Sequence, residues 1–124
     1  MGSPDEVTRW ANMALNMGQL AEEEFWMICL DTKNNVCGVH MISKGNLNSS
    51  IVHPREVFKR ALINNAASII VLHNHPSGNP LPSQNDIDVT RRLKEAGDLM
   101  GIPLMDHIII ADTQHISMKE KFLL

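Results

Sequence analysis

Residues 68–93 have the sequence SIIVLHNHPSGNPLPSQNDIDVTRRL, and this stretch indicates how the chain folds. Its first five residues, 68–72, are rich in β-branched side chains and predict a buried central strand. Three prolines and a glycine between Pro76 and Pro82 predict a loop. A helical pattern then runs from Ser83 to about Met100. A strand, a stiff loop and a helix in this order are typical of an α/β protein.

The segments on either side of this stretch continue the alternation of strand and helix patterns. Before it we expect a helix over 7–18, a hairpin over 25–43, a strand over 47–52 and a helix from His53 to about Asn65. After it we expect strands over 102–111 and around His115, and a terminal helix that starts at Ser117. The apolar stripes of the first two helices consist of Val7, Trp10, Met13, Ala14 and Met17, and of Val57, Phe58, Ala61 and Leu62. The fold class predicted from this order is α/β, with a mixed β-sheet and helices packed against it.

Size and composition are those of one ordinary globular domain. The chain has 124 residues, of which 44% are hydrophobic and 20% charged, and we expect a single domain over 1–124. No apolar run approaches the ~20 residues of a membrane helix, and no secretory leader opens the sequence. We therefore expect a cytoplasmic protein without membrane contacts. Met1-Gly2-Ser3 is typical of residues added at a cloning junction, so we expect this chain to be the C-terminal part of a longer protein.

The net charge, the aromatic content and the two cysteines argue against certain binding surfaces and one kind of metal site. The formal net charge of −3 and the 4% of aromatic residues argue against a surface that grips phosphate backbones or stacks bases. Cys29 and Cys37 lie in apolar stretches, which is typical of reduced core thiols. They do not form a C-x-x-C zinc site, so other groups must hold any metal ion.

Two histidines end the predicted central strand. Because side chains alternate between the faces of a strand, His73 and His75 point to one face and Asn74 to the other. Open α/β sheets bind ligands at such strand ends. The apolar stripe of the following helix, counted back from Val89, begins at Asp86, whereas Asp88 faces solvent. Two imidazole nitrogens and one carboxylate oxygen are typical ligands of hydrolytic zinc sites.

Each part of this pattern also has a purely structural interpretation. Histidines on an apolar strand can be core residues, and Ser83 with Asp86 has the spacing of a helix N-cap. An N-cap is compatible with a functional role for the same residues. The combination of H-x-H, proline, stiff loop, cap serine and inward aspartate favours a metal site.

The spacing of His73, His75, Ser83 and Asp86 resembles the signature of the JAMM (MPN+) metalloprotease domain. The surrounding text HPREVFKRAL, HNHPSG, PSQNDIDVTRRL and DHIII is similar to the bacterial RadC family, over residues from about Glu24 to Leu124. This resemblance implies a cytidine-deaminase-like fold, with helices on both faces of the sheet and zinc at one edge. RadC proteins usually carry an upstream helix-hairpin-helix-like region, and nucleic acid is expected as a partner only through that missing region.

The resemblance also implies a mechanism and the residues that perform it. His73, His75 and Asp86 would hold Zn²⁺, and Ser83 would donate a hydrogen bond to the forming oxyanion. The family pattern requires a general acid/base before an apolar strand; Glu24 matches best, with alternatives at Glu22, Glu23 and Glu56. The implied reaction is hydrolysis of a peptide or isopeptide bond in an unidentified protein or peptide substrate.

Two other functions stay open on the sequence. A metal-dependent nuclease associated with DNA repair is the first, although two histidines and one aspartate favour zinc over magnesium. The second is a non-catalytic interaction module in which the metal braces the loop. A deaminase would need H-x-E and P-C-x-x-C, and the chain contains neither. The contiguous letters of His73-Asn74-His75 match the name of the HNH nucleases but not their spaced motif. The sequence does not predict an oligomeric state.

Overall fold

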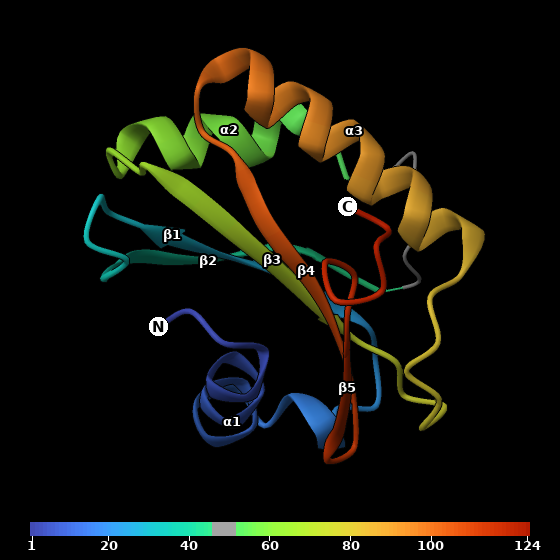
Figure 1. Ribbon diagram of the computed structural model, residues 1–124. Helices are drawn as coiled ribbons and strands as arrows, with labels where there is room; N and C mark the ends of the chain where they lie inside the picture. The colour runs from blue at the N-terminus through green and yellow to red at the C-terminus, as the bar shows by residue number, and fades with distance from the viewer. Residues whose placement is uncertain (46–51) are drawn as a thin grey trace.

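A mixed five-stranded β-sheet forms the centre of the structure, a computed structural model that describes residues 1–45 and 52–124 (Figure 1). The strands, in the order β2-β1-β3-β4-β5, are β1 (Glu24–Leu30), β2 (Val36–Lys44), β3 (Ser68–Asn74), β4 (Leu104–Ala111) and β5 (Gln114–Ser117). The helices are α1 (Pro4–Leu15), α2 (Pro54–Ile63), α3 (Gln84–Met100) and the short 3₁₀ helix η1 (Met17–Gln19). Strands β3 and β4 run parallel, and the other pairs are antiparallel. The predicted α/β class with a mixed sheet is confirmed.

Helices cover both faces of the sheet, as the resemblance implies. Figure 1 shows α2 and α3 on one face and α1 on the other. The central strand β3 is buried along its whole length and supplies both cores. Ile69 and Val71 pack with α2 and α3, whereas Ile70 and Leu72 pack with α1. This alternation decides which side chains beyond Leu72 point toward α3.

The first helix begins and ends earlier than predicted. It spans Pro4–Leu15 rather than 7–18, because Ser3 caps it and forms a capping box with Glu6. Asn16 then adopts a left-handed conformation and ends it. The buried face consists of Val7, Thr8 and Ala11. The predicted stripe is therefore wrong at Ala14 and Met13, whose exposed fraction is 83%.

Three other expectations need correction or fall outside the described residues. Leu62, near the end of α2, is 54% exposed, although it belongs to the predicted apolar stripe. The terminal helix predicted from Ser117 is absent from the described residues: the Glu120 N–H does bond the Ser117 hydroxyl, but only turns follow β5. The strand predicted over 47–52 lies outside the described residues, apart from the buried Val52. Within 1–45 and 52–124, the structure contains no helix of the length and apolarity that a bilayer crossing requires.

Gly18 is the last residue of the predicted first helix. In the structure it lies where two backbone segments approach each other closely. A Cβ atom built on Gly18 would lie 2.1 Å from the carbonyl oxygen of Asp112, in the turn between β4 and β5. Asn12 holds this approach, because its side chain accepts from the Gly18 N–H and donates to the Asp112 carbonyl. A side chain at position 18 would therefore push α1 and η1 away from the sheet.

We expect Gly18→Ala to lower the free energy of unfolding by about 2 kcal/mol, because the added methyl group meets a backbone atom that cannot rotate away. Urea denaturation measures this change as a lower midpoint with an unchanged slope. Gly2→Ala is the control, since a Cβ atom there meets nothing within 4 Å. Equal midpoints for the two variants would show that the two backbones separate freely.

Candidate metal centre

The three residues predicted to bind a metal lie together where β3 ends and α3 begins. Nε2 of His73 is 3.1 Å from one carboxylate oxygen of Asp86, and Nε2 of His75 is 3.2 Å from the other. The two Nε2 atoms are 3.0 Å apart. His73 and Asp86 are buried, and His75 is half-buried. The predicted group is therefore assembled at one edge of the sheet.

The spacing of these atoms fits a tetrahedral metal ion. Ligand atoms bound about 2.0 Å from a tetrahedral zinc ion lie about 3.3 Å from one another. The closest separations are 3.0 Å between the two Nε2 atoms and 3.1 and 3.2 Å to Asp86, where each histidine contacts a different carboxylate oxygen. One ligand atom from each of the three residues lies within 4.8 Å of the others, so the group can close on one ion. Three protein ligands leave a fourth position for a water or substrate, as in catalytic rather than structural zinc sites.

Asp86 is held in place by the start of α3 as well as by the histidines. The Asp86 N–H donates to the Ser83 hydroxyl at 3.1 Å, and the Ser83 N–H donates to Asp86 Oδ2 at 2.8 Å. The N-cap interpretation of this pair and the inward position of Asp86 are thus both correct. Asp88 points away from the centre and accepts a hydrogen bond from Gln84. Because the Ser83 oxygen accepts the Asp86 N–H, its own hydrogen remains available for donation.

The electrostatics of the group stabilise a negative carboxylate beside imidazole rings. Burial alone would raise the pKa of Asp86, but hydrogen bonds from His73 and His75 lower it well below its ordinary value. Burial lowers the pKa of His75, but hydrogen bonds to Asp86 and the Asn79 carbonyl, and the charges of Asp86 and Glu23, raise it overall. The group therefore attracts a cation, either a proton or a metal ion.

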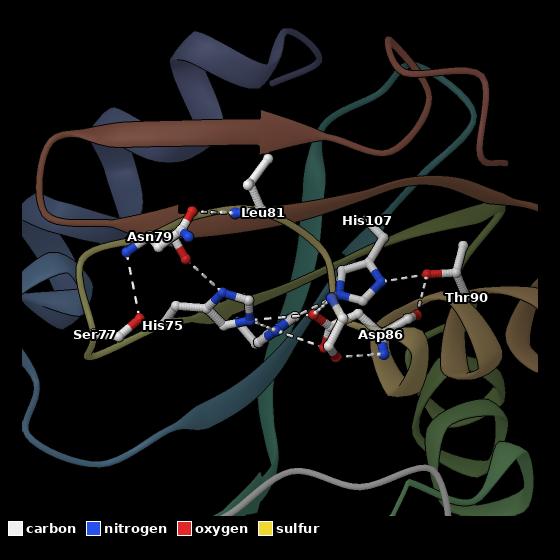
Figure 2. Close-up of polar contacts among 9 residues, drawn as sticks. His75, Ser77, Asn79, Leu81, Asp86, Thr90 and His107 are labelled. Carbon is white, nitrogen blue, oxygen red and sulfur yellow. Dashed lines mark hydrogen bonds and ion pairs between the residues drawn. The ribbon is translucent and has the colours of Figure 1, made fainter.

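The loop after β3 fixes which nitrogen of His75 is free. Figure 2 shows His75 Nδ1 bonded to the backbone carbonyl of Asn79, at 2.8 Å. A carbonyl only accepts, so Nδ1 carries the hydrogen and Nε2 of a neutral ring presents its lone pair to the centre. The Asn79 side chain and Ser77 hold the loop through bonds to the N–H groups of Leu81 and Asn79. The prolines and turn residues of 76–82 thus orient a ligand without touching the metal position.

His107 and Thr90 belong to the centre although the sequence analysis assigned them no role. His107 lies opposite Val71 in the parallel pair β3–β4, and so points to the same face as His73. Its Nε2 is 2.8 Å from Nδ1 of His73, and its Nδ1 is 2.6 Å from the Thr90 hydroxyl (Figure 2). Burial and the neighbouring His73 lower the pKa of His107 well below its ordinary value. The signal was a histidine in an apolar strand, but the strand order is needed to interpret it.

The structure does not bring Glu24 to the metal group. Its carboxylate accepts from the indole N–H of Trp26 at 2.9 Å and lies 4.0 Å from the Lys44 ammonium. Trp26 packs against the α1 core, and Glu24 shares its face of β1. Phe25, on the other face, stacks on His73. The position of Glu24 thus counts against its predicted role as the general acid/base.

Because neighbouring side chains alternate between the two faces of an extended strand, we expect Glu23 on the face opposite to that of Glu24. Asn74, between the two histidines, clamps this segment: its amide donates to the Glu22 carbonyl at 2.9 Å and accepts from the Glu24 N–H at 2.7 Å. The Glu23 carbonyl accepts from Gly45 and so extends the β1–β2 ladder by one residue. The charge of Glu23 helps to raise the pKa of His75.

A polar hollow of about 440 Å³ opens beside His75, lined by Ala21, Glu22, Glu23, Gly45 and Pro76. The two carboxylates give this hollow an acidic lining, and Pro76 connects it to His75 along the chain. Glu56, the remaining alternative for the general acid/base, lies in the first turn of α2, as predicted for a residue that opens a helix.

Comparison with known proteins identifies the family. The family model for the RadC-like JAB domain matches residues 1–123. UPF0758 proteins from Desulfitobacterium hafniense and Clostridium perfringens are 55% and 52% identical to the whole chain, which covers 54% of each. A UPF0758 protein from Bacillus licheniformis is 57% identical over 86% of the chain and 47% of its own length. The chain thus spans about half the length of the curated relatives it matches, and it belongs to the RadC-like JAB domain family.

Proposed function

We propose that this domain is a zinc-dependent hydrolase that cleaves a peptide or isopeptide bond. The observation that carries the proposal is the convergence of two imidazole nitrogens on one buried carboxylate, with atoms about as far apart as the ligands of a tetrahedral ion. Two nitrogens and one oxygen favour zinc over magnesium or calcium, which prefer oxygen ligands. Zinc supplies Lewis-acid chemistry and makes water a nucleophile at neutral pH.

The residues around the metal group are placed to move a proton and to stabilise negative charge. We assign the general acid/base role to Glu23 rather than Glu24, since alternation puts Glu23 on the face opposite to that of Glu24 and Asn74 holds the backbone on both sides of it. Glu23 would accept a proton from the attacking water and return it to the leaving amine. The Ser83 hydroxyl, which has a hydrogen left to donate, would bond the developing oxyanion.

The surroundings of the site favour an amide over a phosphodiester substrate. Glu22 and Glu23 line the hollow beside His75, and two carboxylates there would repel a nucleic-acid backbone. The open fourth position favours catalysis over a metal that only braces the loop. The substrate and partners of the longer relatives remain separate questions, since this chain covers about half of their length.

We expect Asp86→Asn to lower the affinity for Zn²⁺ by more than about 100-fold, because loss of an outer partner alone costs 10–100-fold. The amide keeps an oxygen for the helix cap, so α3 should still form. Asp88→Asn, two residues away and directed outward, is the control and should bind zinc like the wild type. Elemental analysis after dialysis measures the zinc content. Full zinc content in Asp86→Asn would show that Asp86 is not a zinc ligand.

The affinity for zinc should fall as the pH is lowered. Because the pKa of His75 is raised above 6.5, the metal-free protein holds a proton there at a higher pH than an ordinary histidine does. Zinc must displace that proton, so the affinity should fall about tenfold per pH unit below the pKa. Asp86 stays ionised in this range because its pKa is lowered. Titrations between about pH 8 and 5.5 measure the slope. A constant affinity over this range would contradict the assignment of His75.

Glu23→Gln and Glu24→Gln form a matched pair that tests the proton carrier. We expect Glu23→Gln to lower kcat by about 100-fold or more with zinc retained, since general acid/base catalysis contributes 10²–10⁴-fold. Glu24→Gln should change kcat by less than about threefold. A peptide library digested by the zinc-loaded domain gives the rates. Loss of activity in Glu24→Gln alone would restore the role that the sequence predicts. Cleavage of DNA but not of peptides would favour the nuclease instead.

A further inference from the structure

His107 lies fully buried between the metal group and α3. Its ring contacts two polar partners, His73 through Nε2 and the Thr90 hydroxyl through Nδ1. The Thr90 hydroxyl also bonds the backbone carbonyl of Asp86 at 2.8 Å. A hydrogen-bonded chain thus runs from the helix turn that carries one metal ligand to the ring of another (Figure 2).

The number of available hydrogens decides which group donates and which accepts at each step of this hydrogen-bonded chain. Thr90 has one hydroxyl hydrogen, and it donates that hydrogen to the Asp86 carbonyl, which only accepts. The Thr90 oxygen must therefore accept from His107, so the hydrogen of the neutral His107 ring is on Nδ1. Nε2 of His107 then has a lone pair and accepts from Nδ1 of His73. Nε2 is therefore the nitrogen of His73 that faces Asp86 and the metal position.

We propose that Thr90 and His107 are positioning residues that fix His73 with its hydrogen on Nδ1, which leaves Nε2 as a preformed metal ligand. This inference rests on the proposed metal site and deepens it. His75 is held in the same tautomer by a different device, the Asn79 carbonyl. Both rings thus keep Nε2 for the metal position, where the short contacts of the two Nε2 atoms with each other and with Asp86 share the hydrogen that a metal ion would displace.

Without the Thr90 hydroxyl, the donor and acceptor roles along this hydrogen-bonded chain would no longer be fixed. His107 could then carry its hydrogen on Nε2, where it would point at Nδ1 of His73. His73 would accept that hydrogen and hold its own on Nε2, directed at the metal position. Zinc binding would have to reverse both rings, at a cost in affinity.

Thr90→Val tests the proposal because it removes the hydroxyl and keeps the shape of the side chain. We expect the affinity for Zn²⁺, measured by competition with a chromophoric chelator, to fall about tenfold, the lower end of what outer partners contribute. Thr90→Ser, which restores the hydroxyl, should recover the wild-type affinity to within about threefold.

Thr8→Val is the matched control for a buried helical threonine. Thr8 lies in α1 on the other face of the sheet, and within the described part of the chain its hydroxyl is the buried side-chain polar atom without a hydrogen-bond partner. This variant should leave zinc affinity unchanged. Equal affinities for Thr90→Val and the wild type would overturn the proposal, and so would equal losses in Thr90→Val and Thr8→Val.

Nitrogen NMR of the metal-free chain, at about pH 8, reads the tautomers directly and does not depend on zinc. We expect His73 and His107 to carry their hydrogens on Nδ1 in the wild type, and Thr90→Val to shift both toward Nε2. A wild-type His73 without a hydrogen on Nδ1, or one unaffected by Thr90→Val, would overturn the inference. A chain with the expected tautomers that binds no zinc would instead overturn the proposed function and leave the positioning role intact.

Discussion

The buried carboxylate of Asp86 is the constraint on which the rest of the site depends. A charged group so far from water must be compensated on every side. The first turn of α3 supplies the Ser83 N–H, and the end of β3 supplies two imidazole rings. Neither source is sufficient alone, because the cap satisfies one oxygen lone pair and leaves the others directed at His73 and His75. The helix start and the strand end are therefore held together by the same charge, and the stiff loop between them sets how far apart they can lie.

Alternation of side chains along the strands determines which residues lie on the same face of the sheet as the Asp86 carboxylate. On β3, the odd-numbered positions from Ile69 to His73 face α2 and α3, and Asn74 faces α1. On β1 the same rule sends Phe25 to His73 and Glu24 to Trp26. A difference of one residue thus decides whether a carboxylate takes the face of the metal group or bonds an indole on the opposite side. The chemistry of the site depends on the register of two strands as much as on the ligands themselves.

Local patterns in the sequence predicted most of the fold and the ligand group, and failures occurred where distant segments meet. Spacing alone gave His73, His75 and the inward side of Asp86, because alternation and helical periodicity are local properties. The predicted stripe is wrong at Met13 because α1 ends at Leu15 and buries the face that carries Val7, Thr8 and Ala11. His107 and Thr90 had no assigned role because their contacts depend on the pairing of β3 with β4 and on the packing of α3. Glu24 comes directly before Phe25 in the sequence, but alternation puts the two side chains on opposite faces of β1.

The clamp formed by Asn74 has a mechanical consequence for a catalyst. Residues 73–75, at the end of β3, direct two imidazole rings to the metal position on one face of the sheet. Between them, the Asn74 amide bonds the backbone on either side of Glu23. The clamp therefore opposes sliding of β3 against β1 and makes the ligands and the acidic segment move together. The distance between the metal group and Glu23 would then survive thermal deformation of the sheet, even while the outer strands move.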